Sequence, residues 1–364
     1  MEEIKTIGVV GAGQMGSGIA QLAAVHGFDV WLLDSDPNAL GRATEVISNS
    51  IQRLISKGQL PQAVGTDAPK SIHCTTRLED FSAADFVIEA IAESEAVKKK
   101  IFSEVDKITK SSAILASNTS SISITRLASA TSRPHKVSEL GIVLLLCSDI
   151  STLSLLVLLI SIWFISFEMY VHGCCLTWRD DFLVNCLPAG ICGVTSDKLY
   201  LILQVIGMHF MNPPPIMKLV EIIRGADTSD TTFNATKSLA ERFGKTTVCS
   251  QDYSGFIVNR ILMPMINEAF FTLYTGVATK EDIDEGMKLG TNQPMGPLEL
   301  ADFIGLDVCL SILRVLHAGL GDMKYAPCPL LVQYVDAGRL GRKSGIGVYD
   351  YRRAPTIAKQ LTRL

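Results

Sequence analysis

The sequence predicts an α/β fold built on a doubly wound parallel sheet, followed by a separate all-α C-terminal domain. Three observations support this prediction. Short, β-branched apolar segments alternate with helical segments through the N-terminal part of the chain, as in successive strand–helix units. A glycine-rich turn joins the first strand segment to the first helical one. Beyond Gly225 strand signals nearly vanish, and apolar residues recur at spacings of three and four.

Length, charge and cysteine usage limit the kind of protein this can be. The 364 residues are enough for two domains with separate cores. The formal net charge of −4 gives no basic surface of the kind that binds nucleic acid, so we expect no nucleic-acid partner. The chain begins without a signal-peptide pattern, and its nine cysteines have no metal-binding spacing. An intracellular protein with reduced thiols and no metal site is therefore expected.

The glycine-rich turn follows the first predicted strand, residues 6–10, and opens a helix. In its GxGxxG pattern, Gly11 permits a tight turn, Gly13 lets the backbone approach a pyrophosphate, and Gly16 allows close helix–strand packing. Asp34 ends the second predicted strand, where its carboxylate would accept hydrogen bonds from an adenosine ribose. A strand before the glycines, a helix after them and this acid together predict a Rossmann-type dinucleotide site.

The residues after Asp34 indicate which dinucleotide is bound. They are Ser35 and Asp36 rather than arginine, so the 2′-phosphate of NADP would meet negative charge. We therefore expect NAD, with NADP disfavoured.

A polar cluster, residues 117–121, follows the predicted strand at residues 113–116. Ligands of open parallel sheets bind at the carboxyl ends of strands, which favours a ligand site at this cluster. The alternative is a Ser/Thr cap for the helix predicted at residues 122–128. Both interpretations can hold, because one serine can cap while another faces the ligand.

A histidine and a glutamate flank a proline-rich turn later in the chain. His209 ends an apolar run, and the prolines at residues 213–215 can continue neither a strand nor a helix. Glu221 lies in the second apolar segment, residues 218–223. A hairpin-like return could place Glu221 beside His209, where a carboxylate orients an imidazole base. The alternative is a surface histidine and an unrelated glutamate.

These motifs together resemble the NAD-dependent 3-hydroxyacyl-CoA dehydrogenase family, most closely its 3-hydroxybutyryl-CoA branch. The motifs are GAGQMG at 11–16, EAIAE at 89–93, SNTSS at 117–121, GMHFMNP at 207–213, KLVEII at 218–223, GFIVNR at 255–260, PMGPLEL at 294–300 and GRKSGIGVYDY at 341–351. The resemblance implies a Rossmann-type NAD-binding domain over residues 1–225. It also implies an all-α domain over residues 226–351 that binds substrate and forms a homodimer, followed by a tail over residues 352–364.

The resemblance also implies the reaction and the roles of its residues. The enzyme would interconvert (S)-3-hydroxyacyl-CoA and 3-oxoacyl-CoA in fatty-acid metabolism. His209 would take the proton from the 3-hydroxyl as hydride leaves C3 for the nicotinamide, and Glu221 would hold the other imidazole nitrogen. Ser120 and Asn259 would hydrogen-bond the reacting oxygen or the histidine. The residues implied to line the cofactor are Glu93, Lys98, Asn118, Asn212 and Lys343.

Residues 138–205 depart from the family pattern. Within them, the stretch at 140–171 is almost continuously apolar and meets the requirement of roughly 20 residues for a membrane span. Joining Val137 directly to Ile206 restores a family-like strand. We therefore favour an in-frame insertion foreign to the fold, such as a translated retained intron. The competing hypothesis is a genuine membrane anchor inserted in a loop.

Two alternatives to an active acyl-CoA dehydrogenase remain open. One is an insertion isoform that keeps the fold without turnover, and the other is a related dehydrogenase that acts on a hydroxy acid without CoA. The final residues, Thr362, Arg363 and Leu364, look like a degenerate Ser-Lys-Leu address and predict a peroxisomal location. The alternative is a chance tripeptide in a cytoplasmic enzyme.

Overall fold

The structure, a computed structural model, describes residues 3–132 and 204–352. The expectations for the apolar stretch at 140–171, for most of the proposed insertion and for the C-terminal tripeptide lie outside the described residues.

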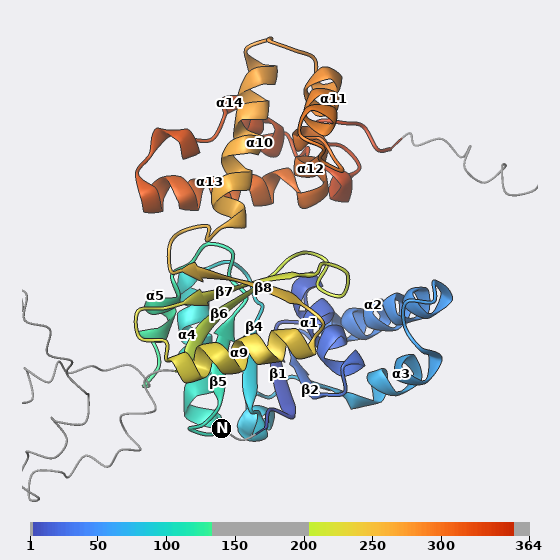
Figure 1. Ribbon diagram of the computed structural model, residues 1–364, viewed down its shortest axis with the longest axis vertical. Coiled ribbons are helices and arrows are strands. Elements are labelled where there is room, and N and C mark those ends of the chain that lie inside the picture. The colour runs from blue at the N-terminus through green and yellow to red at the C-terminus, as the bar shows by residue number, and fades with distance from the viewer. Residues whose placement is uncertain (1–2, 133–203, 353–364) are drawn as a thin grey trace, which may run out of the picture. The chain divides into compact units, whose positions relative to one another are not determined.

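Eight strands form one sheet in the order β3-β2-β1-β4-β5-β6-β7-β8 (Figure 1). They are β1 (Thr6–Val10), β2 (Asp29–Leu33), β3 (Ile72–Thr75), β4 (Phe86–Glu89), β5 (Ile114–Ser117), β6 (Val205–Phe210), β7 (Leu219–Arg224) and β8 (Thr246–Gln251). The first six strands run parallel, whereas β7 is antiparallel to β6 and β8 is parallel to β7. The strand order reverses at β1, so the turn after β1 lies at the topological switch point where doubly wound sheets bind ligands.

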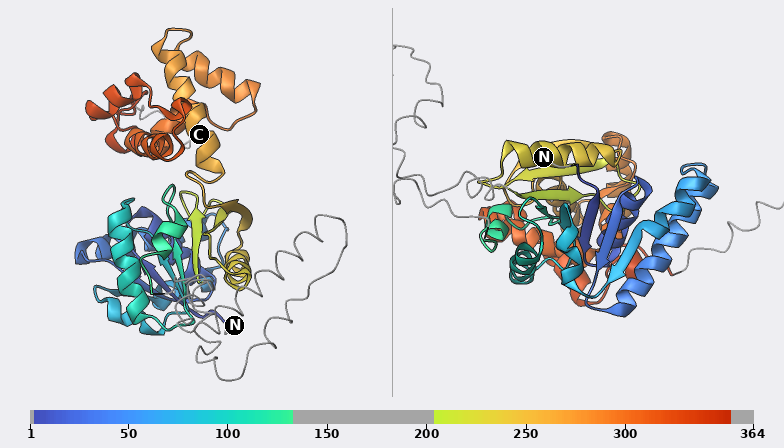
Figure 2. Two further views of the ribbon diagram at one scale, coloured as in Figure 1. Left: turned by 90° about the vertical axis from the view of Figure 1, so that its left-hand side faces the viewer. Right: turned by 90° about the horizontal axis from the view of Figure 1, so that it is seen from below.

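Helices cover both faces of this sheet (Figure 2). They are α1 (Gln14–Val25), α2 (Pro37–Ser56), α3 (Gln62–Asp67), α4 (Glu95–Ile108), α5 (Ile124–Ala128) and α9 (Asp230–Arg242), with 3-10 turns η1 (Ala68–Ser71) and η2 (Leu78–Ala83). Apolar residues of α1, α2 and α9 pack with alternate strand residues such as Phe86 and Ile88. Val87, which points the other way, packs with residues of α4 and α5. The predicted doubly wound sheet is confirmed.

The remaining helices form a second apolar core. They are α10 (Val258–Tyr274), α11 (Lys280–Gly290), α12 (Pro297–Ile304), α13 (Leu306–Leu320) and α14 (Pro329–Asp336), with 3-10 turns η5 (Met323–Tyr325) and η6 (Arg342–Ser344). Phe270, Leu313 and Leu331 are fully buried in this core. In the described part of the chain, no single helix is long and apolar enough to cross a membrane. Only α12 and α13 together meet that test, as a pair bent by 98°.

The boundary between the two domains lies later than the sequence suggested. The prediction that an all-α region begins at residue 226 is wrong, because α9 and β8 still belong to the sheet domain. Strand β8 pairs with β7 at the edge of the sheet, and of its six residues only Ser250 is buried. An edge strand with so little buried surface needs no apolar run, so its sequence carries a weak strand signal. The helical domain begins at α10.

Strand β6 begins inside the segment proposed as an insertion. Val205 is buried and pairs with Leu115 of β5, so this valine already occupies a position in the sheet. A chain that joined Val137 to Ile206 would place another valine at that position.

Candidate active site

The glycine-rich turn after β1 has the backbone conformation that a phosphate-binding turn requires. Gly11 has φ of +104°, and a Cβ there would lie 2.7 Å from the Ala90 carbonyl oxygen. A Cβ on Gly16 would lie 1.7 Å from the Gly11 carbonyl oxygen, so α1 can pack on the turn only with glycine at this position. A Cβ on Gly13 would meet no atom within 4 Å, and no side chain caps α1 there. The first backbone amides of α1 can therefore bind an anion.

Asp34 lies directly after β2, beside this turn. Its Oδ2 accepts a hydrogen bond from Ala12 N–H at 2.8 Å, and its Oδ1 accepts one from Asp36 N–H at 3.0 Å. Each carboxylate oxygen keeps capacity for another donor, so both ribose hydroxyls can be bound. The nearby Arg42 guanidinium lies 3.3 Å from the Asp36 carboxylate on the surface, so this cation is already paired with a negative charge. These contacts suit the ribose of NAD better than the 2′-phosphate of NADP.

His209 and Glu221 are directly opposite each other on the antiparallel strands β6 and β7. His209 Nδ1 lies 2.7 Å from Glu221 Oε2, with His209 7% exposed and Glu221 fully buried. The predicted hairpin-like return is confirmed, and the alternative of two unrelated residues is excluded. Because a carboxylate can only accept, Nδ1 carries the proton and leaves Nε2 free to act as a base.

Glu221 is held at both oxygens. Its Oε1 accepts the N–H groups of Ile257 and Val258 at 3.0 Å each, at the start of α10. Burial alone would raise the pKa of Glu221, but the hydrogen bond and charge of His209, with the Val258 and Ile257 amides, outweigh burial and lower the pKa. The carboxylate therefore stays ionised beside the imidazole.

The Ser-Asn-Thr-Ser-Ser cluster after β5 is organised by Glu93. Its Oε1 accepts hydrogen bonds from Thr119 Oγ1 at 2.6 Å, from Ser120 N–H at 2.9 Å and from Ser120 Oγ at 3.0 Å. It also accepts from the backbone and hydroxyl of Ser121 at 3.1 and 3.0 Å. The helix cap expected in this cluster lies instead at Ser123, whose side chain accepts from Arg126 N–H. Ser117, Thr119 and Ser121 are buried, so only Asn118 and Ser120 of this cluster keep exposed surface that could face a ligand.

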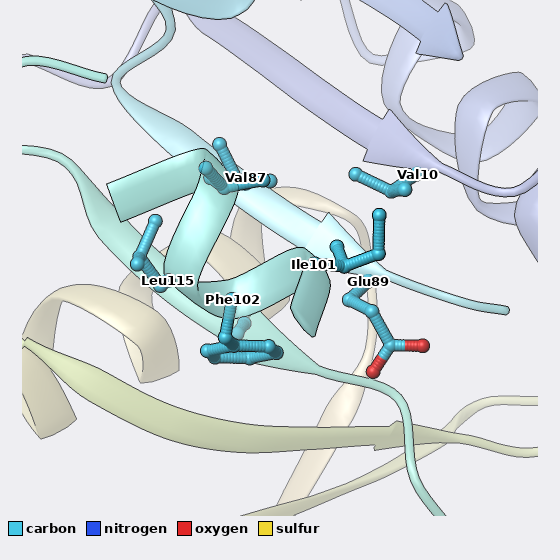
Figure 3. A pocket seen from close by; sticks show the side chains of 8 residues that line it. Val10, Val87, Glu89, Ile101, Phe102 and Leu115 are labelled. Atoms are coloured by element: carbon cyan, nitrogen blue, oxygen red, sulfur yellow. The ribbon is translucent and has the colours of Figure 1, made fainter. Parts of the chain in front are cut away.

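Lys98 is fully buried rather than open to a ligand, which differs from its expected place in the cofactor lining. Its Nζ lies 2.6 Å from Glu89 Oε1 and 3.4 Å from Glu93 Oε2. Glu89, which sequence reasoning had not singled out, also accepts from Ser117 Oγ at 2.6 Å. Glu89 lines a pocket together with apolar side chains that include Val10 and Phe102 (Figure 3). The sequence does carry a signal for this pair, since Glu89 ends an apolar strand and Lys98 follows nine residues later.

The other expected site residues connect the strand ends. Asn118 Oδ1 accepts Phe210 N–H at 2.9 Å, and Asn212 Oδ1 accepts Gln14 Nε2 at 3.1 Å. Asn259 Nδ2 donates to the Ser120 carbonyl at 3.4 Å. These contacts bring the turn after β1, the serine cluster and the His209 strand together.

Lys343 lies in η6 of the helical domain. Its Nζ is 2.6 Å from Asp307 at the start of α13. The structure therefore pairs this residue, expected to line the cofactor, with a carboxylate of its own domain.

A switch-point dinucleotide turn and a buried carboxylate–imidazole pair, backed by a helical second domain, define the class of nicotinamide-dependent dehydrogenases. The model of the 3-hydroxyacyl-CoA dehydrogenase NAD-binding domain matches residues 6–141 and 199–253, and that of the C-terminal domain matches residues 255–351. The chain belongs to the 3-hydroxyacyl-CoA dehydrogenase family and is an NAD-dependent oxidoreductase. The NAD-binding match passes over residues 142–198, which lie within the proposed insertion.

Relatives match the chain over nearly its whole length. A 3-hydroxybutyryl-CoA dehydrogenase of Bradyrhizobium diazoefficiens is 45% identical over 354 residues, with 97% of this chain and 98% of the relative covered. A probable 3-hydroxybutyryl-CoA dehydrogenase of Bacillus subtilis is 44% identical, with 96% and 98% covered. The crystal structure of (S)-3-hydroxybutyryl-CoA dehydrogenase from Ralstonia eutropha has a TM-score of 0.74 at 40% identity, with 96% and 99% covered.

Proposed function

We propose that this protein interconverts (S)-3-hydroxybutyryl-CoA and its 3-oxoacyl-CoA partner with NAD. The main observation behind the proposal is the His209–Glu221 pair, which lies in the same sheet as the strand that leads into the dinucleotide turn. The names of the relatives support a short 3-hydroxyacyl-CoA as substrate. The wider reaction is NAD-dependent oxidoreduction of a hydroxyacyl-CoA, and the proposed role of the protein is in fatty-acid metabolism.

His209 is the base in this proposal. With its Nδ1 proton held by Glu221, Nε2 takes the proton of the substrate 3-hydroxyl, and the buried carboxylate stabilises the imidazolium that forms. Bound NAD supplies the acceptor for the hydride that leaves C3. Proton transfer by a well-placed base contributes about 10²–10⁴-fold to the rate.

Asn259 holds the reacting oxygen, and Ser120 holds the histidine. The Ser120 hydroxyl donates to Glu93, so its oxygen can accept a hydrogen bond from the imidazolium. The Asn259 amide reaches the backbone of Ser120, so it can donate to an oxygen bound beside that residue. Alignment of these groups accounts for the rest of the catalytic effect.

Gly11, Gly13 and Gly16 would bind the pyrophosphate, and Asp34 the ribose. Glu93, Asn118 and Asn212 would shape the nicotinamide end through the loops they hold. Lys98 would act through Glu93, and Lys343 would reach the cofactor only from the helical domain.

The direct test is NADH oxidation with acetoacetyl-CoA, comparing the full chain with one lacking residues 138–205. Activity in both would mean that the insertion is tolerated. Activity only in the shortened chain would identify an isoform disabled by its insertion, an outcome that the unmatched residues 142–198 make a specific second candidate. Turnover of free 3-hydroxybutyrate but not of its CoA thioester would show that the substrate is a free hydroxy acid rather than an acyl-CoA. Silence of both folded chains would overturn the proposal.

We further propose that the helical domain forms a homodimer. Its surface carries exposed apolar side chains, among them Ile261, Val277 and Leu289. Exposed apolar surface of this kind is typical of an interface. Light scattering on the purified protein tests the proposal, and a monomer at micromolar concentration would contradict it.

The origin and location of the protein give two further proposals. The segment at 138–205 is proposed to be a translated intron, and transcript and genomic sequence across it test this, since an exon boundary absent at Val137 would contradict it. Recovery of the protein in a membrane fraction would favour an anchor instead.

A peroxisomal location is proposed from the final tripeptide. A diffuse cytosolic signal from a fluorescent fusion of this tripeptide would contradict the proposed location.

A further inference from the structure

The turn between β8 and α10 has an unusual backbone. Gly255 has φ of +79° and the next residue, Phe256, has φ of +50°. Positive φ is easy for glycine, but a bulky aromatic residue there is an outlier that persists only where its surroundings hold it. Such outliers gather at functional sites, which makes the surroundings of Phe256 informative.

Contacts on both sides fix this turn in place. On one side, Asp252 accepts hydrogen bonds from Ser123 Oγ at 2.7 Å and from Thr125 N–H at 2.8 Å, at the start of α5. On the other side, a Cβ on Gly255 would lie 2.5 Å from Leu316 Cδ2 of α13, and this contact together with the positive φ favours glycine. Phe256 itself is 4% exposed and lies in the apolar core of the sheet domain. The strained conformation is therefore imposed by packing rather than by a local preference.

Phe256 contacts His209, and the two residues that follow it donate hydrogen bonds to Glu221. The centroid of its ring lies 5.8 Å from that of the His209 imidazole, with the planes tilted by 58°. Directly after it, the amides of Ile257 and Val258 donate to Glu221 Oε1. The same residue thus supplies an apolar wall for the imidazole and sets the direction of the two amides that hold the carboxylate.

We propose that Phe256 is a positioning residue for the His209–Glu221 pair. Its ring restricts rotation of the imidazole, and its positive-φ backbone aims the first amides of α10 at Glu221. Without those amides, Oε1 would be a buried acceptor without a donor, and the carboxylate would turn away from Nδ1. This inference rests on the proposed dehydrogenase activity only for its kinetic test.

The kinetic test uses substitutions that separate the ring from the backbone. Phe256→Ala removes the ring and keeps a Cβ at positive φ, whereas Phe256→Gly removes the ring and relieves the strain. Phe256→Leu keeps apolar bulk without the ring, which protects folding. Phe270→Leu is the matched control, since Phe270 is equally buried, in the core of the helical domain.

We expect kcat per folded enzyme to fall about 100-fold for Phe256→Ala and about tenfold for Phe256→Gly and Phe256→Leu, with KM within about threefold of wild type. Phe270→Leu should lower thermal stability and leave kcat per folded enzyme unchanged. A wild-type kcat in Phe256→Ala, a loss confined to KM, or an equal loss of kcat in Phe270→Leu would overturn the proposal. Equal kcat in the alanine and glycine variants would overturn its backbone part.

A second readout does not require turnover. Hydrogen exchange at the Ile257 and Val258 amides should be slow in the wild-type protein and faster in Phe256→Ala. Unchanged exchange would overturn the proposal even in an inactive protein. A wild-type chain without activity but with this exchange pattern would instead count against the proposed function alone.

Discussion

His209 and Glu221 occupy facing positions of β6 and β7, and this pairing sets the geometry of the site. The strand register brings Nδ1 and Oε2 to 2.7 Å, and the amides of Ile257 and Val258 hold the carboxylate in that orientation. A change of register by one residue between the two strands would send one of the two side chains to the opposite face of the sheet. The sheet therefore brings the two side chains together, and the turn before α10 holds them in place.

Substituting either member of this pair should lower kcat much more than it raises KM. His209→Gln removes the base, and we expect kcat to fall by about 10³-fold. Glu221→Gln keeps the size of the side chain but removes the charge that stabilises the imidazolium, and we expect a fall of about 100-fold. Steady-state kinetics with acetoacetyl-CoA and NADH measure both. A Glu221→Gln enzyme with wild-type kcat would show that the carboxylate plays no part in the chemistry.

The buried ion pair of Lys98 should be important for stability. Lys98→Met leaves the buried Glu89 without its cation, and removing one partner of a buried pair costs about 3–5 kcal/mol. Lys99→Met is the matched control, because Lys99 makes a partly exposed pair with Glu95 that is worth about 0.5 kcal/mol or less. Denaturant unfolding of both variants gives the comparison.

A double variant sharpens the test of this pair. Lys98→Met combined with Glu89→Gln removes the uncompensated charge and should recover part of the lost free energy of unfolding. Equal destabilisation by the Lys98 and Lys99 substitutions would contradict the structural role assigned to the buried cation.

The sequence predicts this site wherever its signal is local. The glycine turn and Asp34 lie within one strand–helix–strand unit, and His209 and Glu221 lie in strands joined by a prolyl turn, so spacing alone brings them together. The place of Lys98 is not predicted because a lysine on an amphipathic helix normally reaches solvent, and only the fold reveals the carboxylates of Glu89 and Glu93 that pair with it.

Other features leave no readable signal in the sequence. The polar edge strand β8 gains its place from pairing with β7 rather than from an apolar pattern. The backbone of Phe256 is set by contacts with distant residues, and its residue type predicts the opposite conformation. These long-range constraints are what sequence patterns of a single chain do not record.

Cofactor preference should depend on two neighbouring carboxylates in different ways. Asp34→Asn weakens hydrogen bonds to the ribose, and we expect the KM for NADH to rise about tenfold with little change in kcat. Asp36→Asn can still cap α2 while removing negative charge, so we expect an unchanged KM for NADH and a lower KM for NADPH. Steady-state kinetics of both variants with NADH and with NADPH measure these KM values. An Asp34→Asn enzyme with wild-type KM for NADH would remove Asp34 from the binding site.

Lys245 should make the stability of the protein depend on alkaline pH. This buried lysine donates to the carbonyls of Pro214 at 2.6 Å and Met217 at 2.9 Å, in the turn between β6 and β7. Burial lowers its pKa from 10.5 to about 8. Between these two values the unfolded chain binds more protons than the folded one, so stability due to this group rises with pH.

Lys245→Met lacks that titration. The difference in Tm between wild type and Lys245→Met should therefore shift in favour of the wild type as the pH rises from about 8 to about 10. The neutral amine no longer bears the cost of a buried charge, and its two N–H groups can still donate to the carbonyls of the turn. Thermal unfolding of both proteins at matched pH values gives this difference, in which groups common to both cancel. A difference that stayed constant across this range would show that Lys245 titrates alike in the folded and unfolded states, and that its burial against the turn between β6 and β7 carries no cost.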